Sequence, residues 1–413
     1  MEEKKNGIIS LMALLFLPPI ISLPISFYCA NICKQRLLSV YVFFAVLSLI
    51  FSYFSPIYDT IHNISFAQYF DFAYDSIFEL KVAFMIIHTF EYITGLEGMN
   101  FFIILFWACL CLLFNSFKNY IGFDKHIFVI SFGCVAIVSL ISLSFFTFAS
   151  ILFIWIITNK FNNRILKIVL LLIFPTIFHK SIILVTLPGI LLFLIRSEER
   201  KYLNCVLVAL LVIFYIALFN NSLTTLLLQT DLVPGTEYMQ YKADDYLGDG
   251  TWGSGNSFDS SMSRILQNLI QYSIQLLAII LFLIRKKNKF NLLESIFIVN
   301  IIIVISSLNL YVINQRFCIS GVILSCLYIV KYCSDYNNSN TFNSKFIKRF
   351  KYIIILFYMI SFHEIFTTAY RDPLIPKSTA NEITNRLLYM PGILLLDISD
   401  FGFNDNIINQ NKL

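Results

Sequence analysis

The sequence has few charged residues for its length. Of its 413 residues only 13% are Asp, Glu, Lys or Arg, and 58% are hydrophobic. Ordinary soluble domains carry roughly 25% charged and 45–50% apolar residues, so this composition excludes a soluble globular protein. Apolar runs recur from residue 8 to residue 370, so they form the architecture rather than one anchor. The sequence predicts an all-α polytopic integral membrane protein.

Three other features are missing. None of the nine cysteines has metal-ligand spacing in a polar loop, so we expect them to pack as small residues and expect neither metal nor other cofactor. The apolar runs lack the acidic relay that a proton- or ion-coupled carrier usually has at mid-membrane. No internal repeat stands out, which weighs weakly against transporters built from two similar halves.

The apolar runs predict the number of membrane helices. A crossing helix needs about 20 apolar residues, and the uncharged runs lie at 8–30, 37–56, 101–117, 202–220, 265–284, 295–313, 317–330 and 352–362. Two further stretches have basic clusters at both ends and are too long to cross once. We expect each to return as a helical hairpin, 127–144/146–158 and 168–178/181–195. Residues 1–413 then form a single multi-pass domain of about twelve membrane helices.

The basic residues predict which side each loop faces. Most Lys and Arg residues cluster between alternate runs, which marks those loops as cytoplasmic. Both termini and the loops 57–100, 221–263 and 371–413, which carry most of the acids, then lie outside. Lys4 and Lys5 argue mildly for a cytoplasmic N-terminus, and that placement would require the proline-containing run 8–30 to be a re-entrant hairpin.

The first outer loop combines carboxylates with tyrosines, the usual equipment for holding sugar hydroxyls and stacking on sugar rings. The residues concerned are Tyr58, Asp59, Asp71, Tyr74 and Glu79. Apolar side chains then recur at helical spacing at Phe78, Val82, Met85, Ile86 and Phe90, which predicts an amphipathic helix. We expect this helix to lie in the membrane interface. The alternative to a sugar site is that the tyrosines are ordinary belt residues of that interface.

The tip of the second hairpin, residues 175–181, places His179 and Lys180 between wholly apolar segments. Such groups are costly near lipid and mostly mark a pathway or a site. The alternative is an interfacial turn from which Lys180 reaches water.

Three arginines lie at predicted outer ends of spans, against the general charge trend: Arg264, Arg316 in the expected turn 314–317, and Arg371. The arginine side chain presents a rigid fork of donors that suits phosphate oxygens. Glu364 is an acid well inside an otherwise apolar span, and it could either pair with an arginine or act as an acid or base. Cations, carboxylates and aromatics facing outward suit a substrate with a phosphate on a lipid and a sugar in water.

In the order of these features the sequence resembles the bacterial polysaccharide polymerase group typified by the EpsG family and Wzy-type O-antigen polymerases. The matching features are the early Asp/Tyr segment, Phe78-Glu79 before an apolar span, the tip Phe178-His179-Lys180-Ser181 and Arg316, over roughly residues 37–335. The chain departs from the family before the span 146–158, where members often have an Arg-Gln pair and this chain has Ser144-Phe145-Phe146-Thr147.

The resemblance implies a metal-independent glycosyltransferase in the bacterial cytoplasmic membrane, with its active site facing the periplasm or exterior. It would join oligosaccharide units linked to undecaprenyl diphosphate, as in O-antigen, capsule or exopolysaccharide synthesis. Arg316, Arg264 and Lys180, with Arg371, would bind the diphosphate, since cations stabilise the charge that develops on a leaving diphosphate. His179 would act on the diphosphate or the acceptor. Acceptor activation would fall to one of Asp59, Asp71, Glu79 or Glu364.

The expected partners are therefore the lipid-linked donor and acceptor and membrane lipid, together with a chain-length regulator protein and no nucleic acid. Tyr58, Tyr74 and, in the loop 221–263, Trp252 would contact the glycan. Two other classes of function stay open. One is a flippase for the same lipid-linked units, although the charges gather at outer ends rather than along a central cavity. The other is a related lipid-dependent transferase such as an O-antigen ligase.

Overall fold

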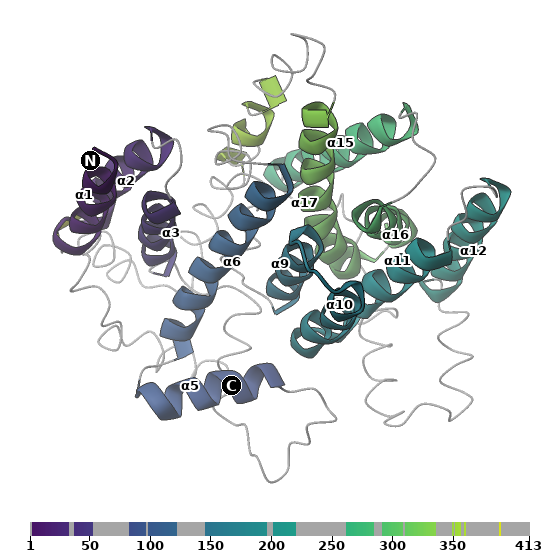
Figure 1. Ribbon diagram of the computed structural model, residues 1–413, viewed down its shortest axis with the longest axis horizontal. Coiled ribbons are helices and arrows are strands. Elements are labelled where there is room, and N and C mark those ends of the chain that lie inside the picture. The colour runs from purple at the N-terminus through teal and green to yellow at the C-terminus, as the bar shows by residue number, and fades with distance from the viewer. Residues whose placement is uncertain are drawn as a thin grey trace. The chain divides into compact units, whose positions relative to one another are not determined.

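The computed structural model describes the chain over residues 2–32, 37–52, 82–95, 98–121, 145–195, 201–219, 262–284, 291–308, 310–335, 349–350, 352–356, 359–360 and 388–389. Within these ranges the regular structure is helical, and no strand occurs there (Figure 1). The expected all-α class is therefore confirmed for this part of the chain. The expected arm 127–144 lies outside the described residues.

The chain divides into two compact units. One contains residues 1–155, 177–180 and 351–413, and the other contains residues 156–176 and 181–350. Of the described helices, those from α1 (Glu2–Phe16) to α9 (Phe145–Thr158) belong to the first unit, except for the last residues of α9. Those from α10 (Arg164–Phe178) to α17 (Tyr311–Asp335) belong to the second, except for the end of α10.

The first apolar run is divided at its prolines. Helix α1 (Glu2–Phe16) ends just before Pro18, and α2 begins at Pro19 and ends at Ile32. Proline lacks the N–H that a helix interior needs, so the run breaks there. The apolar run 8–30 therefore forms two helices of 15 and 14 residues rather than one.

Both halves of this run pack on α3 (Leu37–Ser52). A Cβ on Gly7 would lie 2.8 Å from Leu38 Cδ2, so the beginning of α1 lies against the beginning of α3. Near the end of α2, the rings of Phe27 and Phe43 are 5.5 Å apart. The beginning of α1 and the end of α2 thus both lie near the first half of α3, as in a helical hairpin.

Helix α5 (Val82–Thr94) is the amphipathic helix that the sequence predicts, and it ends at Gly95, whose φ of 68° suits glycine. Figure 1 shows α5 running across the beginning of α6 (Gly98–Ile121), where the Phe90 and Phe101 rings are 5.5 Å apart. The most buried described residue of α5 is Ile87, which the predicted stripe omitted.

The second unit begins with a helical hairpin. Helix α10 (Arg164–Phe178) is followed by the short helix η2 (Lys180–Ile182) and α11 (Ile183–Ile195), close to the expected arms 168–178 and 181–195. The Arg164 guanidinium lies 4.6 Å from the centre of the Phe193 ring, so the beginning of α10 meets the end of α11. Helix α12 (Lys201–Phe219) then joins through a hydrogen bond from the Tyr215 hydroxyl to the Leu184 carbonyl.

Three helices complete the unit: α15 (Met262–Ile284), α16 (Leu292–Ser306) and α17 (Tyr311–Asp335). Helix α16 begins with a capping box, in which Asn291 Oδ1 accepts from Glu294 N at 2.9 Å and Glu294 Oε2 accepts from Asn291 N at 2.8 Å. Glu294 is thus engaged in starting a helix. At Gly189 of α11, a Cβ would lie 3.0 Å from the Cα of Ile296, so glycine permits a close approach of α11 to α16.

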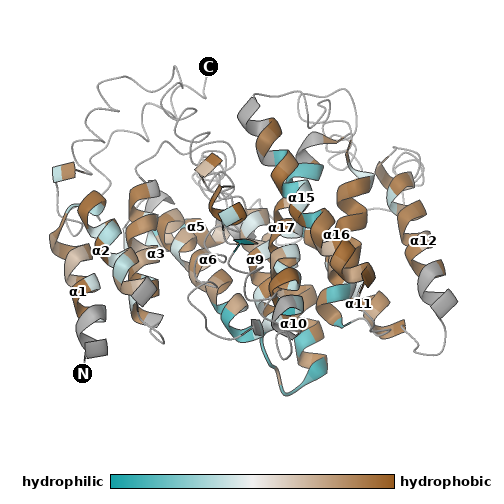
Figure 2. Cartoon of the chain, turned by 90° about the horizontal axis from the view of Figure 1, so that it is seen from above, coloured by the Kyte–Doolittle hydropathy of each residue, from teal (hydrophilic) through white to brown (hydrophobic). Residues whose placement is uncertain are grey.

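Hydrophobic residues, drawn in brown, make up most of the helices in Figure 2. Among the described residues, two helices are long and apolar enough to cross a membrane, Phe101–Tyr120 in α6 and Ile313–Tyr332 in α17. Eight shorter apolar helices of 10–17 residues accompany them in the described part of the chain.

Helix α15 has its polar side inward. Its amides at Asn268, Gln271 and Gln275 are at most 9% exposed, whereas Leu269, Leu276 and Leu283 are 50%, 57% and 73% exposed. Teal residues interrupt the brown ribbon of α15 in Figure 2. A helix at a water-exposed surface shows the opposite arrangement. This pattern fits a helix whose outer face meets lipid and whose polar groups bond inside a bundle.

Candidate functional site

Four of the predicted site residues lie within the described part of the chain: His179, Lys180, Arg264 and Arg316. For Arg264 only its place in the helix is described. The remaining predictions lie outside the described residues and stay predictions: Tyr58, Asp59, Asp71, Tyr74, Glu79, Trp252, Glu364 and Arg371.

His179 occupies the break between α10 and η2. Its ring meets that of Phe146 edge to face, with centroids 5.2 Å apart and planes at 89°. The neighbouring Phe178 ring meets Phe148 in the same manner at 4.7 Å. Such aromatic pairs have preferred geometries and hold the ring orientation. The imidazole is therefore half-buried and oriented by the beginning of α9 (Phe145–Thr158).

Phe146, at the beginning of α9, is fully buried, and its ring contacts the His179 ring. The Phe146 ring thus supports His179 at the tip of the hairpin between α10 and α11. Lys180, the next residue, is exposed.

The position of Arg316 differs from the expected one. The turn between α16 and α17 lies at 307–310, where Ser307 N and Leu310 N donate to Ile303 O and Ser307 O at 2.9 Å each. Residues 314–317 are helical, so the prediction that Arg316 lies in a turn is wrong. Arg316 is a half-buried residue within the first two turns of α17.

Asn314 explains why the helix begins earlier than expected. Its Nδ2 donates to Val304 O at 2.7 Å, which satisfies a carbonyl at the end of α16, and its Oδ1 accepts from the Tyr272 hydroxyl at 2.5 Å. Orphan carbonyls at a helix end need such partners when buried. One side chain therefore joins three helices beside Arg316.

The contacts between α15 and α17 show that these helices run parallel. Tyr272 meets Asn314, Gln275 Nε2 meets Cys318 Sγ at 3.0 Å, and further along the Phe282 and Tyr328 rings are 6.0 Å apart. Residue numbers rise together along both helices, so both begin at the same end of the pair. We call this end, where Met262 and Tyr311 begin the two helices, the arginine end.

Helix α16 runs antiparallel to α17, because Asn300 bonds to Ser320 whereas Val304 bonds to Asn314. Arg264 lies in the first turn of α15, at the arginine end. Arg316 of α17 lies level with Tyr272 of α15. Tyr272 is roughly two helical turns further along α15 than Arg264. The fold of this unit thus brings two arginines, 52 positions apart in the sequence, toward one end of two neighbouring helices.

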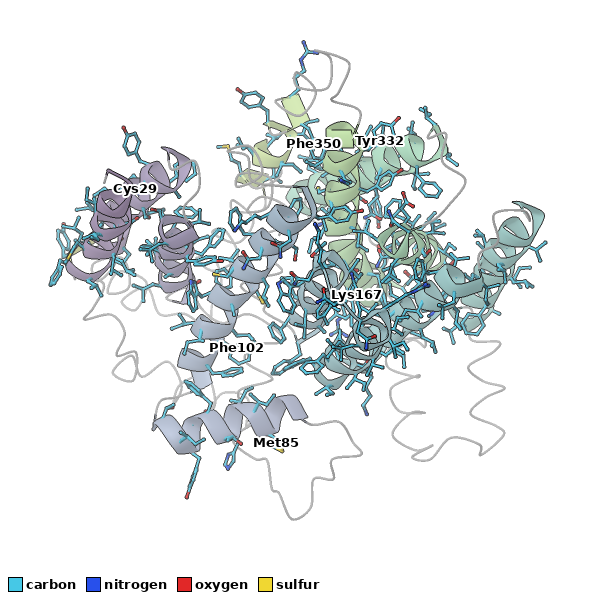
Figure 3. All side chains as sticks on the ribbon, viewed as in Figure 1. Cys29, Met85, Phe102, Lys167, Tyr332 and Phe350 are labelled. Atoms are coloured by element: carbon cyan, nitrogen blue, oxygen red, sulfur yellow. The ribbon has the colours of Figure 1, made fainter. Side chains whose placement is uncertain are left out.

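Lys167 makes a contact that the sequence did not reveal. Its Nζ donates to Ile157 O at 2.5 Å and to Asn159 O at 2.9 Å, at the end of α9 (Figure 3). A cation stabilises carbonyls at a helix C-terminus. Lys167 precedes the apolar segment 168–178, and its partial burial lowers its pKa. This lysine therefore has a structural role in starting the hairpin.

The buried amides of the second unit were also missed as a group. The hydropathy of α15 predicts an apolar span, although Asn268, Gln271 and Gln275 recur on one helical face. The helical spacing of these three amides in the sequence could have indicated that they share a buried face. The described residues contain no group of three His, Cys, Asp or Glu side chains that could hold a metal ion.

Arginine side chains suit anions with several oxygens, such as a diphosphate. Comparisons of the chain with protein-family models, with curated proteins and with solved structures find no match.

Proposed function

We propose that this protein is a polysaccharide repeat-unit polymerase, a metal-independent glycosyltransferase of the bacterial cytoplasmic membrane. Its substrates are oligosaccharide units linked to undecaprenyl diphosphate, and its active site faces the periplasm or exterior. The observation that carries this proposal is the placement of Arg264 and Arg316 toward one end of the parallel helices α15 and α17.

Three features support a location in the membrane. The two long apolar helices α6 and α17 have the required length, and α15 turns leucines outward and amides inward. Helix α5 crosses the beginning of α6, as expected for a helix lying in the interface. With the basic segments 285–289 and 345–351 in the cytoplasm, the arginine end faces outward.

The reaction we propose transfers a growing glycan from its carrier to a new unit. A hydroxyl oxygen at the non-reducing end of the acceptor forms a bond to the anomeric carbon of the donor. The bond from that carbon to the phosphate oxygen breaks, and the electron pair leaves with undecaprenyl diphosphate. Arg264 and Arg316, with Lys180 and Arg371, stabilise the negative charge that develops on this leaving group.

The hydroxyl proton passes to a base on the protein. His179 suits this role because imidazole accepts protons near neutral pH. Its edge contact with Phe146 restricts the ring orientation. The carboxylates of Asp59, Asp71, Glu79 and Glu364 are the other candidates. Tyr58, Tyr74 and Trp252 supply aromatic faces for the glycan, and a chain-length regulator is the expected protein partner.

Substitution of Arg316 tests the proposal. In a deletion strain that expresses the variant, Arg316→Ala should abolish long-chain polysaccharide and leave single-unit capped lipid. Arg316→Lys should remain impaired, because a point charge does not replace the guanidinium fork. The readout is the polysaccharide ladder at matched protein abundance.

The matched control is Arg164→Ala, which removes an exposed arginine that lies over Phe193 in another helix pair. It should keep a normal ladder. A normal ladder from Arg316→Ala would remove Arg316 from the site. Loss of single-unit capped lipid in the deletion strain itself would indicate a ligase or flippase instead.

A further inference from the structure

A proline interrupts the backbone hydrogen bonding of α11. Pro188 lies inside this helix. In an α-helix the N–H of residue 188 would donate to the carbonyl of Leu184, four positions earlier, but proline has no N–H. A carbonyl without a donor is unfavourable in apolar surroundings. The Leu184 carbonyl therefore needs a donor from another part of the chain.

Tyr215 of α12 supplies that donor. Its hydroxyl donates to the Leu184 carbonyl oxygen, across 31 positions of the sequence. The Tyr215 side chain is fully buried, and its ring stacks on that of Phe219 with centroids 6.0 Å apart and planes at 18°. The orientation of the Tyr215 ring is thus held from within α12. Its hydroxyl replaces the hydrogen bond that Pro188 removes.

A second hydroxyl bond in the same segment is local by comparison. The Thr186 hydroxyl donates to Ile182 O at 3.2 Å, one turn earlier in the chain. That bond satisfies a carbonyl without reaching another helix. The bond from Tyr215 instead joins α12 to α11, and both of these helices also pack on α16.

Gly189 directly follows Pro188 and holds this part of α11 close to α16. A Cβ at Gly189 would lie 3.0 Å from the Cα of Ile296, so the two backbones approach closely at this position. Proline is a usual cause of bends in a helix. The first half of α11, residues 183–187, is therefore joined to the second half at a weak point, and the Tyr215 hydroxyl holds it.

We propose that Tyr215 is a latch on a hinge of α11 at Pro188-Gly189. With the hydroxyl bound to Leu184 O, residues 183–187 are held to α12, and without it they turn about the hinge. These residues directly follow η2, which begins with Lys180 of the hairpin tip. Tyr215 is thus a positioning residue for the tip, and this role in positioning rests on the proposed function.

A comparison of double variants tests the latch. Tyr215→Phe removes the hydroxyl and keeps the ring, so it should lower the thermal unfolding midpoint of the full chain in detergent by about 2–4 °C. Pro188→Ala restores an N–H that donates to Leu184 O within α11. In the Pro188→Ala background, Tyr215→Phe should therefore lower the midpoint by much less.

The matched control background is Pro175→Ala, which replaces the proline inside α10. Tyr215→Phe should keep its full effect there, because the Pro175 position does not donate to Leu184 O. An equal fall of the midpoint in the wild-type, Pro188→Ala and Pro175→Ala backgrounds would overturn the latch.

Hydrogen–deuterium exchange locates the change without any substitution of proline. In Tyr215→Phe, the backbone amides of residues 183–191 should exchange faster, whereas those of α17 should keep the wild-type rate. Equal acceleration in α11 and α17 would show general destabilisation and contradict a hinge in α11.

The polysaccharide ladder at matched protein abundance tests the positioning role. Tyr215→Phe should shorten the ladder of the wild-type protein and should leave the ladder of the Pro188→Ala variant as it is. A normal ladder from Tyr215→Phe, together with a lowered midpoint, would contradict positioning of the tip. Failure of the proposed function shows differently, as loss of single-unit capped lipid in the deletion strain, and the midpoints still decide whether the latch exists.

Discussion

At the scale of single residues, the structure separates the cations that support the fold from those available to a ligand. Lys167 is bound to two carbonyls at the end of α9, and Arg164 covers the Phe193 ring. Lys180 is exposed beside His179. Position in the sequence alone does not distinguish these three cations, since Arg164, Lys167 and Lys180 all flank the same apolar segment 168–178. The groups that each side chain contacts in the structure distinguish them.

His179 yields a prediction at this scale. The His179→Gln variant keeps polarity and approximate size but loses the ability to accept a proton near neutral pH. It should strongly reduce long-chain polysaccharide while membrane abundance and single-unit product stay intact. Lys180→Arg should be milder, because the charge is kept. A wild-type ladder from His179→Gln would make the hairpin tip a structural turn.

At the scale of helices, α15, α16 and α17 form a bundle with polar contacts inside and leucines outside. Helix association in lipid depends on packing and hydrogen bonds between helices, since lipid tails are as apolar as leucine. The contacts of Asn314 with Tyr272 and Val304 fix the first turns of α17. The position of Arg316 therefore depends on neighbouring helices as well as on its own.

The Tyr272 hydroxyl gives a test of that dependence. Tyr272→Phe removes the donor to Asn314 and leaves the buried Asn314 Oδ1 without it. The free energy of unfolding should fall by about 1–3 kcal/mol, measured by thermal or denaturant unfolding in detergent. Polymer formation should fall as well, because Arg316 shifts. The control Tyr28→Phe, at a residue that is 67% exposed, should change neither quantity.

The helices were more predictable from the sequence than their ends. The hydropathy of the runs was sufficient to locate α3, α6, α9, α10, α11, α12 and α15. It misplaced the turn before α17 because charged Arg316 suggested an end, whereas Asn314 satisfies the end of α16 from within the next helix. The run 8–30 is apolar throughout, but Pro18-Pro19 interrupts its helical hydrogen bonding, so it forms α1 and α2.

The site was less predictable than the helices, because contacts between residues distant in the sequence bring its residues together. The common end of Arg264 and Arg316 depends on α15 and α17 being parallel neighbours, which only contacts between distant residues such as Gln275 and Cys318 reveal. The support of His179 by Phe146 likewise joins positions that no local pattern connects.

At the scale of the whole molecule, the division of the first apolar run changes the expected topology. Helices α1 and α2 are shorter than the roughly 20 residues that a crossing needs. The beginning of α1 and the end of α2 both pack on the first half of α3. If the run enters and returns on one side, the N-terminus shares the side of Lys34 and Arg36. The basic residues Lys4 and Lys5 favour the same, cytoplasmic, side.

Labelling of single cysteines in a cysteine-free background tests this topology. A membrane-impermeant thiol reagent added to sealed cells should label Ser254→Cys in the loop 221–263. It should fail to label Glu3→Cys, Asn288→Cys and Ser344→Cys until the membrane is permeabilised, because basic segments stay in the cytoplasm. Labelling of Glu3→Cys in sealed cells would return the N-terminus to the outside and make α1 and α2 a single bent crossing. Labelling of Asn288→Cys or Ser344→Cys would invert the predicted sides of α15 and α17, so that the arginine end could not face the periplasm and the proposed polymerase site would fail with it.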